Sequence, residues 1–244
     1  MTGAWRTLGR LLVLQASWTY ERLQGVGVGF ASLPLLDELR RDPARHRAAV
    51  ARAAEYFNAH PYLAGIAVGA AAKAELTDVP GPTIQRLKTA LAGPLGALGD
   101  QLFWIGAVPL IMGLLLGAVA FGAGAWVVAV GFATYLTIRL GVTLWGLRLG
   151  LRSGLGVSAA LKVSGLQGIV HRVGLAAGFA VGAAVPLVAE WFAAPSERHL
   201  GPIAMALGGA AGVVAALVRR RVPTSRRLTL VAVAGVLLWH WSVR

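Results

Sequence analysis

The sequence predicts an all-α integral membrane protein. Of its 244 residues, 57% are hydrophobic and only 14% are charged, whereas soluble domains carry about 25% charged residues. Long apolar runs follow one another from Leu102 onward. Such a chain has more apolar side chains than one soluble core can bury. We therefore expect amphipathic N-terminal helices, short re-entrant or broken segments, and then about five transmembrane helices.

The net charge of +13 fits a membrane protein, because Lys and Arg collect in cytoplasmic loops. A nucleic-acid partner is not expected, since the basic residues flank apolar runs rather than alternate with aromatic residues on one face. The chain contains no cysteine. Disulfides, cysteine metal sites and thiol nucleophiles are therefore excluded.

The N-terminal part differs in composition from the rest. Residues 1–61 are expected to form an amphipathic or interfacial region, and residues 62–244 a membrane transport domain. In the first helix, over residues 5–24, Leu11, Leu14 and Trp18 share one face. Two alternatives stay open for this helix: it lies at headgroup level, anchored by its tryptophans, or it packs against the rest of the protein.

Two apolar segments are too short to cross about 30 Å of hydrocarbon. The first is Gly25–Pro34, whose three glycines disfavour a regular helix. The second is Tyr62–Ala72. Re-entrant or buried hairpin backbone is tolerated at membrane depth only where protein covers it or water lines it. Between them we expect a surface helix over 42–57, with Asp42 as N-cap and Pro43 at the first helical position.

Membrane-length apolar runs fill the second half of the chain. The candidate spans are Leu102–Phe121, Gly124–Trp145, Val173–Phe192, Leu200–Val218 and Leu228–Trp241. Basic connections alternate with one that contains Glu197, which predicts a cytoplasmic N-terminus and an external C-terminus. Arg139 falls inside the second span, so either that span ends earlier or Arg139 is paired.

The segment Leu91–Trp104 precedes the first span and concentrates helix breakers. We expect these residues to break the helix: Gly93, Pro94, Gly96 and Gly99. The break is either an ordinary connector or a broken element whose freed backbone groups face a solute. Asp100 then lies at the mouth of the span. It is either an N-cap for a helix that begins at Gln101 or a carboxylate that binds a polar solute, and the two roles can coexist.

Other polar residues are candidates for solute contacts. Asn58 and His60 precede Pro61 and suit hydrogen bonding to sugar hydroxyls; the alternative is loop capping and a solvated imidazole. Glu75 is a candidate ligand or a solvated carboxylate paired with Lys73. The histidines lack metal-ligand spacing, and no catalytic triad, P-loop or dinucleotide fingerprint is present. We therefore expect no metal, no cofactor and no catalysis by this chain alone.

Three separated blocks together resemble the IID subunit of the mannose/fructose/sorbose-type bacterial sugar phosphotransferase system. The first is Leu14–Gln24, LQASWTYERLQ. The second is Phe57–Pro61, FNAHP, which Glu75 follows at the distance of the family's glutamate. The third is Ile84–Trp104, with Lys88 and the run GPLGALGD. Their order and spacing match the family as well.

The resemblance implies a permease subunit of the bacterial inner membrane that works with a IIC membrane subunit. The pair binds a hexose and presents it to a phosphorylated cytoplasmic IIB (or IIAB) protein, which phosphorylates the sugar during uptake. A IID subunit carries no phosphorylation site, and the IIC–IID pairs assemble as oligomers. On this basis the expected polar contacts to sugar come from Asn58, His60, Glu75, Asp100 and Gln101. Trp104 is expected either to stack on the sugar or to serve as a core or interface residue.

The sequence departs from the family pattern at several positions. Thr19, Ala59 and Gln101 stand where the family has Asn, Thr and Ser, and Gln101 alters size and hydrogen bonding beside Asp100. The departures leave the sugar open. They also leave an alternative function, a membrane regulatory or scaffold protein derived from this family without transport.

Overall fold

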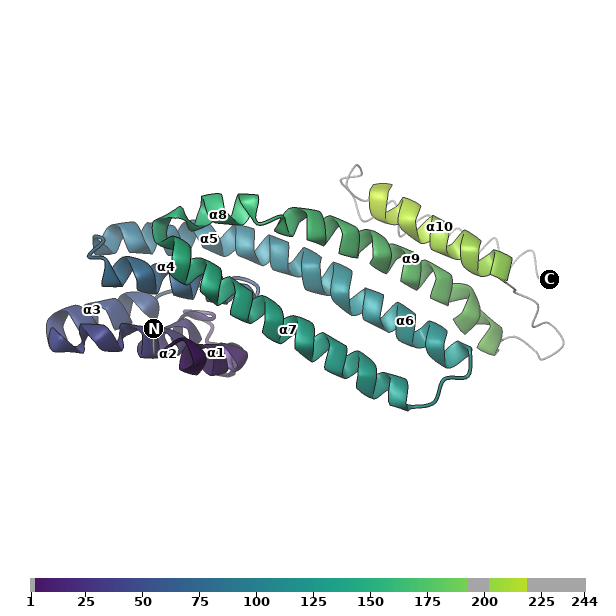
Figure 1. Ribbon diagram of the computed structural model, residues 1–244, viewed down its shortest axis with the longest axis horizontal. Helices are drawn as coiled ribbons and strands as arrows, with labels where there is room; N and C mark the ends of the chain where they lie inside the picture. The colour runs from purple at the N-terminus through teal and green to yellow at the C-terminus, as the bar shows by residue number, and fades with distance from the viewer. Residues whose placement is uncertain (1–2, 193–201, 219–244) are drawn as a thin grey trace.

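A computed structural model describes residues 3–192 and 202–218, and these residues are organised as helices (Figure 1). The predicted span Leu228–Trp241 lies outside the described residues. The elements are α1 (Ala4–Leu12), η1 (Leu14–Ser17), α2 (Gly25–Leu36), η2 (Asp37–Arg41), α3 (Pro43–Ala53), α4 (Ala64–Leu76), α5 (Gly81–Leu102), η3 (Phe103–Ala107), α6 (Val108–Ala120), α7 (Trp126–Ser153), η4 (Gly154–Gly156), α8 (Val157–Val163), α9 (Leu166–Phe192) and α10 (Pro202–Val218).

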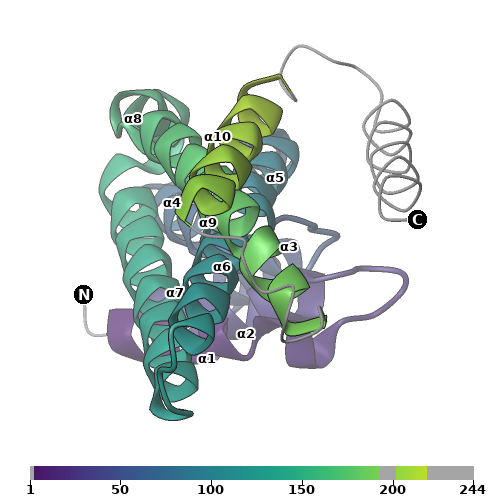
Figure 2. The ribbon, with the colours of Figure 1, turned by 90° about the vertical axis from the view of Figure 1, so that its right-hand side faces the viewer.

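Three helical stretches of the described chain are long and apolar enough to cross a membrane. They cover Gly81–Ala120, Trp126–Val163 and Leu166–Ala189, and α10 adds a shorter apolar helix. Viewed along the long axis, α6 lies between α7 and α9, and α10 packs on α9 (Figure 2). The prediction of an all-α membrane protein is confirmed.

The helix break predicted within Leu91–Trp104 was wrong. α5, η3 and α6 form one continuous rod (Figure 1), and Pro94 lies inside α5. A helix in apolar surroundings must satisfy its backbone groups internally, which outweighs the propensity cost of Gly and Pro. Asp100 lies within the helix, so it is not an N-cap. The irregularity comes directly after it, where η3 widens into a π-helical turn, a feature frequent at functional sites.

The short segment Tyr62–Ala72 contributes most of α4, which protein covers. All residues from 61 to 70 are buried. Glycines bring α4 and α7 into backbone contact: a Cβ added to Gly150 would lie 2.2 Å from the Ile66 carbonyl oxygen. The small residues of this segment therefore serve close helix packing.

The other short segment forms the regular helix α2 rather than a hairpin. Its glycines lie against neighbouring backbone, and a Cβ on Gly27 would lie 2.2 Å from the Leu14 carbonyl oxygen. A Cβ on Gly25 would lie 2.3 Å from the Glu55 carbonyl oxygen. The gain from close packing outweighs the helix propensity that these glycines lose.

The N-terminal helices gather at one end of the long rods (Figure 1). Asp42 caps α3 as predicted, because its carboxylate accepts hydrogen bonds from the amides of Ala44 (3.1 Å) and Arg45 (3.0 Å). The first helix is shorter than predicted. Leu11 and Leu14 are buried, while Trp18 is half-exposed. The inner face therefore packs on the protein.

Arg139 lies inside α7 and is paired, which resolves the alternative about its span. Its guanidinium donates to the Leu12 carbonyl oxygen (2.6 Å) and lies over the Tyr62 ring, 4.7 Å from the centroid. Leu12 ends α1, where free carbonyl groups and the helix dipole favour a cation. Arg139 thus attaches the N-terminal helices to a membrane-length helix.

Candidate functional site

The second and third sequence blocks meet around His60. Its imidazole is 2% exposed and stacks on Phe103, with ring centroids 4.9 Å apart and planes inclined by 8°. Trp104 lies 5.7 Å away and Tyr62 4.9 Å away between centroids. We call these four rings the His60 cluster: His60, Tyr62, Phe103 and Trp104. Phe103 and Trp104 come from η3, so the π-helical turn positions half of the cluster.

Glycine in α5 makes this contact possible. A Cβ added to Gly99 would lie 2.1 Å from the Cβ of His60 and 2.3 Å from its Cγ. One turn earlier, a Cβ on Gly96 would lie 3.8 Å from the Cα of Ala59. These glycines therefore do not break the helix: they provide the surface on which the Asn58–His60 loop lies.

The first block holds the same loop from the other side. Gln24 is buried, and its side-chain amide donates to the Ala59 carbonyl (2.6 Å) and accepts from the Ala59 amide (3.4 Å). The Gln24 amide also donates to the Phe57 carbonyl (2.9 Å). All three sequence blocks thus converge on the Phe57–His60 loop.

The polar atoms of His60 differ in their surroundings. Nδ1 accepts a hydrogen bond from the Tyr62 amide (3.3 Å) just before α4. Nε2 has no partner among the described residues. Burial lowers the pKa of His60 to about 4, against the opposing effect of the Asp100 charge. The loop-capping role is present, but the imidazole is not solvated as that alternative supposed.

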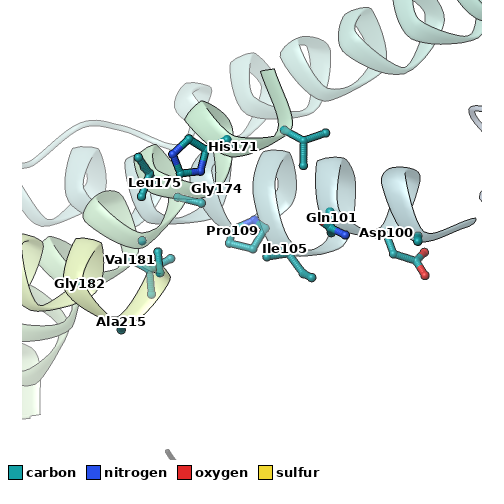
Figure 3. A pocket seen from close by; sticks show the side chains of 16 residues that line it. Asp100, Gln101, Ile105, Pro109, His171, Gly174, Leu175, Val181, Gly182 and Ala215 are labelled. Atoms are coloured by element: carbon teal, nitrogen blue, oxygen red, sulfur yellow. The ribbon is translucent and has the colours of Figure 1, made fainter. Parts of the chain in front are cut away.

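The other candidates at this site are open to the surroundings. Asn58, Asp100 and Gln101 are exposed. Asp100 and Gln101 line a cavity of about 720 Å³ between the α5–α6 rod, α9 and α10. In Figure 3 the Asp100 carboxylate lies at one end of this cavity and points away from α9, while His171 lies on α9. The walls are mainly small and apolar, and α10 approaches α9 closely at its glycines.

Glu75 lies elsewhere. It is near the end of α4, eleven residues after Ala64, which is roughly 16 Å along a helix. It is 5% exposed, and both carboxylate oxygens accept from Arg52 at 2.8 Å. Of the two alternatives for Glu75, the solvated carboxylate paired with Lys73 was wrong, because α3 packs Arg52 onto Glu75. The hydrogen bond from Glu75 raises the pKa of Arg52 above its ordinary value.

Lys88 completes this second polar group. It is buried, and its ammonium donates to the carbonyl oxygens of Arg52 and Ala53, the latter at 3.0 Å. A lysine on the last carbonyls of α3 is a favourable helix C-terminal contact. We call Arg52, Glu75 and Lys88 the α3 clamp, because they tie α3 to α4 and α5.

Comparison with known proteins decides the family. Residues 3–197 match the family model described as the PTS system mannose/fructose/sorbose family IID component.

The chain belongs to this family. The fructose permease IID component of Bacillus subtilis (strain 168) is 28% identical over 183 residues, covering 73% of this chain and 65% of that protein. The sorbose-specific EIID component of Klebsiella pneumoniae is 30% identical over 191 residues, covering 72% and 65%. The mannose-specific EIID component of Escherichia coli (strain K12) is 26% identical over 186 residues, covering 73% and 64%. This IID chain thus spans a little under two thirds of the length of these relatives.

Solved structures support the fold. One described as a structure of a membrane protein has a TM-score of 0.69 at 21% identity, and covers 98% of this chain and 96% of its own. A mannose transporter ManYZ in complex with microcin E492 has a TM-score of 0.58 at 20% identity, with the same coverage. An EIID component is a membrane component of its phosphotransferase complex and not the phosphorylating subunit. No cluster of metal-ligating side chains occurs in the part of this IID chain that the structure describes.

Sequence reasoning missed some of the residues that build this site. Gln24 and Phe103 lie within the quoted motifs, yet nothing in their spacing indicated that one holds the loop and the other stacks on His60. Tyr62 directly follows the His-Pro pair and gave no separate signal. His171 gave no signal in the sequence, because only the packing of α9 on α5 brings it to the cavity.

Proposed function

We propose that this IID chain pairs with a IIC subunit in the bacterial inner membrane, with its N-terminus cytoplasmic. Together they form the path and binding site for a hexose, which a phosphorylated IIB (or IIAB) protein phosphorylates during uptake. The family supports the phosphotransferase context, and the names of the relatives support mannose, fructose or sorbose as substrate candidates.

The observation that carries the proposal is the meeting of the Asn58–His60 loop with the Gly96–Asp100 turn of α5. Two motif segments that are distant in sequence are in contact there, and they carry an amide (Asn58), an imidazole (His60) and a carboxylate (Asp100). Such groups suit sugar hydroxyls, which both donate and accept hydrogen bonds. Trp104 is 53% exposed and lies 5.7 Å from His60 between ring centroids, so it offers an aromatic face near the loop.

The arrangement also supports a shared site. Asn58, Asp100 and Gln101 are exposed rather than enclosed, and a solute site normally buries most of its ligand. A hexose with several hydroxyl groups needs more partners than these side chains provide. We infer that the IIC subunit closes the site over this face, and that IIC–IID pairs form the larger assembly.

The test is uptake of radiolabelled mannose, fructose and sorbose by the reconstituted IIC–IID complex with phosphorylated IIB. Asp100→Asn is expected to raise KM by roughly ten- to a hundredfold, because one charged hydrogen-bond acceptor is lost. Glu38→Gln makes the same charge change on the exposed surface of η2 and is expected to leave KM unchanged.

Two results would count against the proposal. Unchanged KM in Asp100→Asn, with normal membrane insertion, removes Asp100 from the site. Absence of uptake of every sugar by the intact wild-type complex would instead favour the regulatory or scaffold alternative.

A further inference from the structure

His60 is fixed in one chemical form by its neighbours. The Tyr62 amide donates to Nδ1 (3.3 Å), so Nδ1 carries the lone pair and not the proton. In a neutral imidazole the proton then resides on Nε2. The ring is stacked on Phe103 and pressed against Gly99, which prevents it from turning over to exchange the two nitrogens.

The Nε2–H group is a buried donor without an acceptor in residues 3–192 and 202–218. More than nine in ten buried polar groups in proteins are paired, and an unpaired buried donor costs folding free energy. Neither of the charged side chains near the ring accepts a hydrogen bond from Nε2–H. Asp100 acts on His60 only through its charge, and Arg139 lies over the ring of Tyr62.

We propose that His60 is a permanent hydrogen-bond donor whose Nε2–H binds an oxygen acceptor from outside the described chain. This inference deepens the proposed function and rests on it. The acceptor is a hydroxyl oxygen of the transported sugar or a carbonyl oxygen of the IIC partner. His60 therefore neither accepts a proton nor carries a charge during uptake.

Access to Nε2 requires a side chain to move, because this atom is buried. Within the His60 cluster, Tyr62 is 8% exposed and Phe103 is fully buried, whereas Trp104 is 53% exposed. Trp104 is thus the ring with room to rotate toward the surroundings.

Two substitutions separate the Nε2–H donor of His60 from its Nδ1 acceptor, which binds the Tyr62 amide. The amide nitrogen of His60→Gln reaches the position of Nε2 and keeps the donor, but loses the acceptor for the Tyr62 amide. The amide oxygen of His60→Asn keeps that acceptor in the manner of an Asx turn but has no donor at the Nε2 position. We expect His60→Gln to retain uptake within about threefold while lowering thermal stability. We expect His60→Asn to keep stability while reducing uptake by about tenfold or more.

The measurements use the full IIC–IID complex with phosphorylated IIB and the three labelled sugars. If the acceptor is a sugar hydroxyl, His60→Asn raises KM and leaves co-purification with IIC intact. If the acceptor belongs to IIC, His60→Asn weakens co-purification. Equal loss of uptake in His60→Gln and His60→Asn, with both proteins folded, overturns the proposal.

An independent readout is the ¹⁵N NMR spectrum of the histidine-labelled complex, in which His60→Asn assigns the resonance. We expect a neutral ring with the proton on Nε2 from pH 6 to 8, roughly two or more units above the pKa of about 4. A proton on Nδ1, or a charged ring at pH 7, overturns the proposal. This readout does not need transport, so it stays decisive if the wild-type complex takes up no sugar and the proposed function fails.

Discussion

In the α3 clamp, loss of Arg52 is expected to destabilise the protein more than loss of Glu75. The Glu75 side chain is 6% exposed and the Arg52 side chain is 25% exposed. Arg52→Ala leaves a buried carboxylate without its partner, which costs about 3–5 kcal/mol and lowers Tm by roughly 6–20 °C for a chain of this size. Glu75→Ala leaves an arginine that can turn toward solvent, so a smaller loss is expected.

A matched control is available in the same region. Arg40 donates to Asp37 at 3.0 Å, with side chains that are 68% and 40% exposed. Exposed ion pairs contribute about 0–1 kcal/mol. Arg40→Ala is therefore expected to leave Tm nearly unchanged, in an assay that follows thermal unfolding of the detergent-solubilised protein by circular dichroism.

The double variant Arg52→Met/Glu75→Leu tests the reasoning further. Replacing a buried pair by apolar residues of similar size is often neutral, so Tm is expected to recover most of the loss seen in Arg52→Ala. Sugar uptake should recover with it, as expected of a clamp that holds α3 in place and lies apart from the His60 cluster. If the double variant regains its Tm but does not take up sugar, Glu75 is a sugar ligand. A loss in Arg52→Ala no larger than in Arg40→Ala would refute the argument about the buried carboxylate.

Three further predictions concern the His60 cluster and its anchors. Gly99→Ala is expected to lower both Tm and uptake, since its Cβ would lie 2.1 Å from His60, whereas Gly93→Ala meets nothing within 4 Å and should be neutral or stabilising; equal effects in the two variants would contradict the packing. Arg139→Leu should release α1 from α7 by removing the bond to Leu12, seen as reduced disulfide formation between cysteines introduced on the two helices of this cysteine-free chain. The pKa of His60 is lowered from 6.5 to about 4, so between these pH values the unfolded chain binds a proton that the folded chain does not. The free energy of unfolding should therefore be highest above pH 6.5 and fall as the pH drops toward 4, and this pH dependence should be absent in His60→Asn.

The sequence predicted the membrane fold well and the local geometry around Asp100 poorly. The membrane fold follows from the apolar runs and the sparse charge. For Arg139 the sequence left two alternatives, an earlier end of the span or a paired side chain, and the structure shows the pairing. The helical conformation of Gly93, Pro94 and Gly99 could not be predicted in this way, because helix propensity describes an isolated chain. In the folded protein a rod continues through all three, and the irregular turn comes later, at η3.

Contacts among the sequence blocks were predictable only in part. Their joint occurrence indicated that Asn58, His60 and Asp100 belong to one site, and the structure brings the loop and α5 together. It does not bring Glu75 there. No spacing rule reveals that Arg52 lies across from Glu75, since that contact depends on how α3 packs on α4.

Hydrogen-bond satisfaction separates the motif residues into two groups. Gln24, Glu75 and Lys88 are buried, and their polar atoms form hydrogen bonds with other parts of the chain. Their substitution should therefore mainly reduce the stability of the fold. His60 keeps one donor unpaired, and Asp100 lies exposed beside it. Buried polar groups in proteins are normally paired, so an unpaired donor next to an exposed carboxylate indicates a surface that is completed by something else. We infer that the first group builds the scaffold, and the proposal made above for the sugar and the IIC partner concerns the second group.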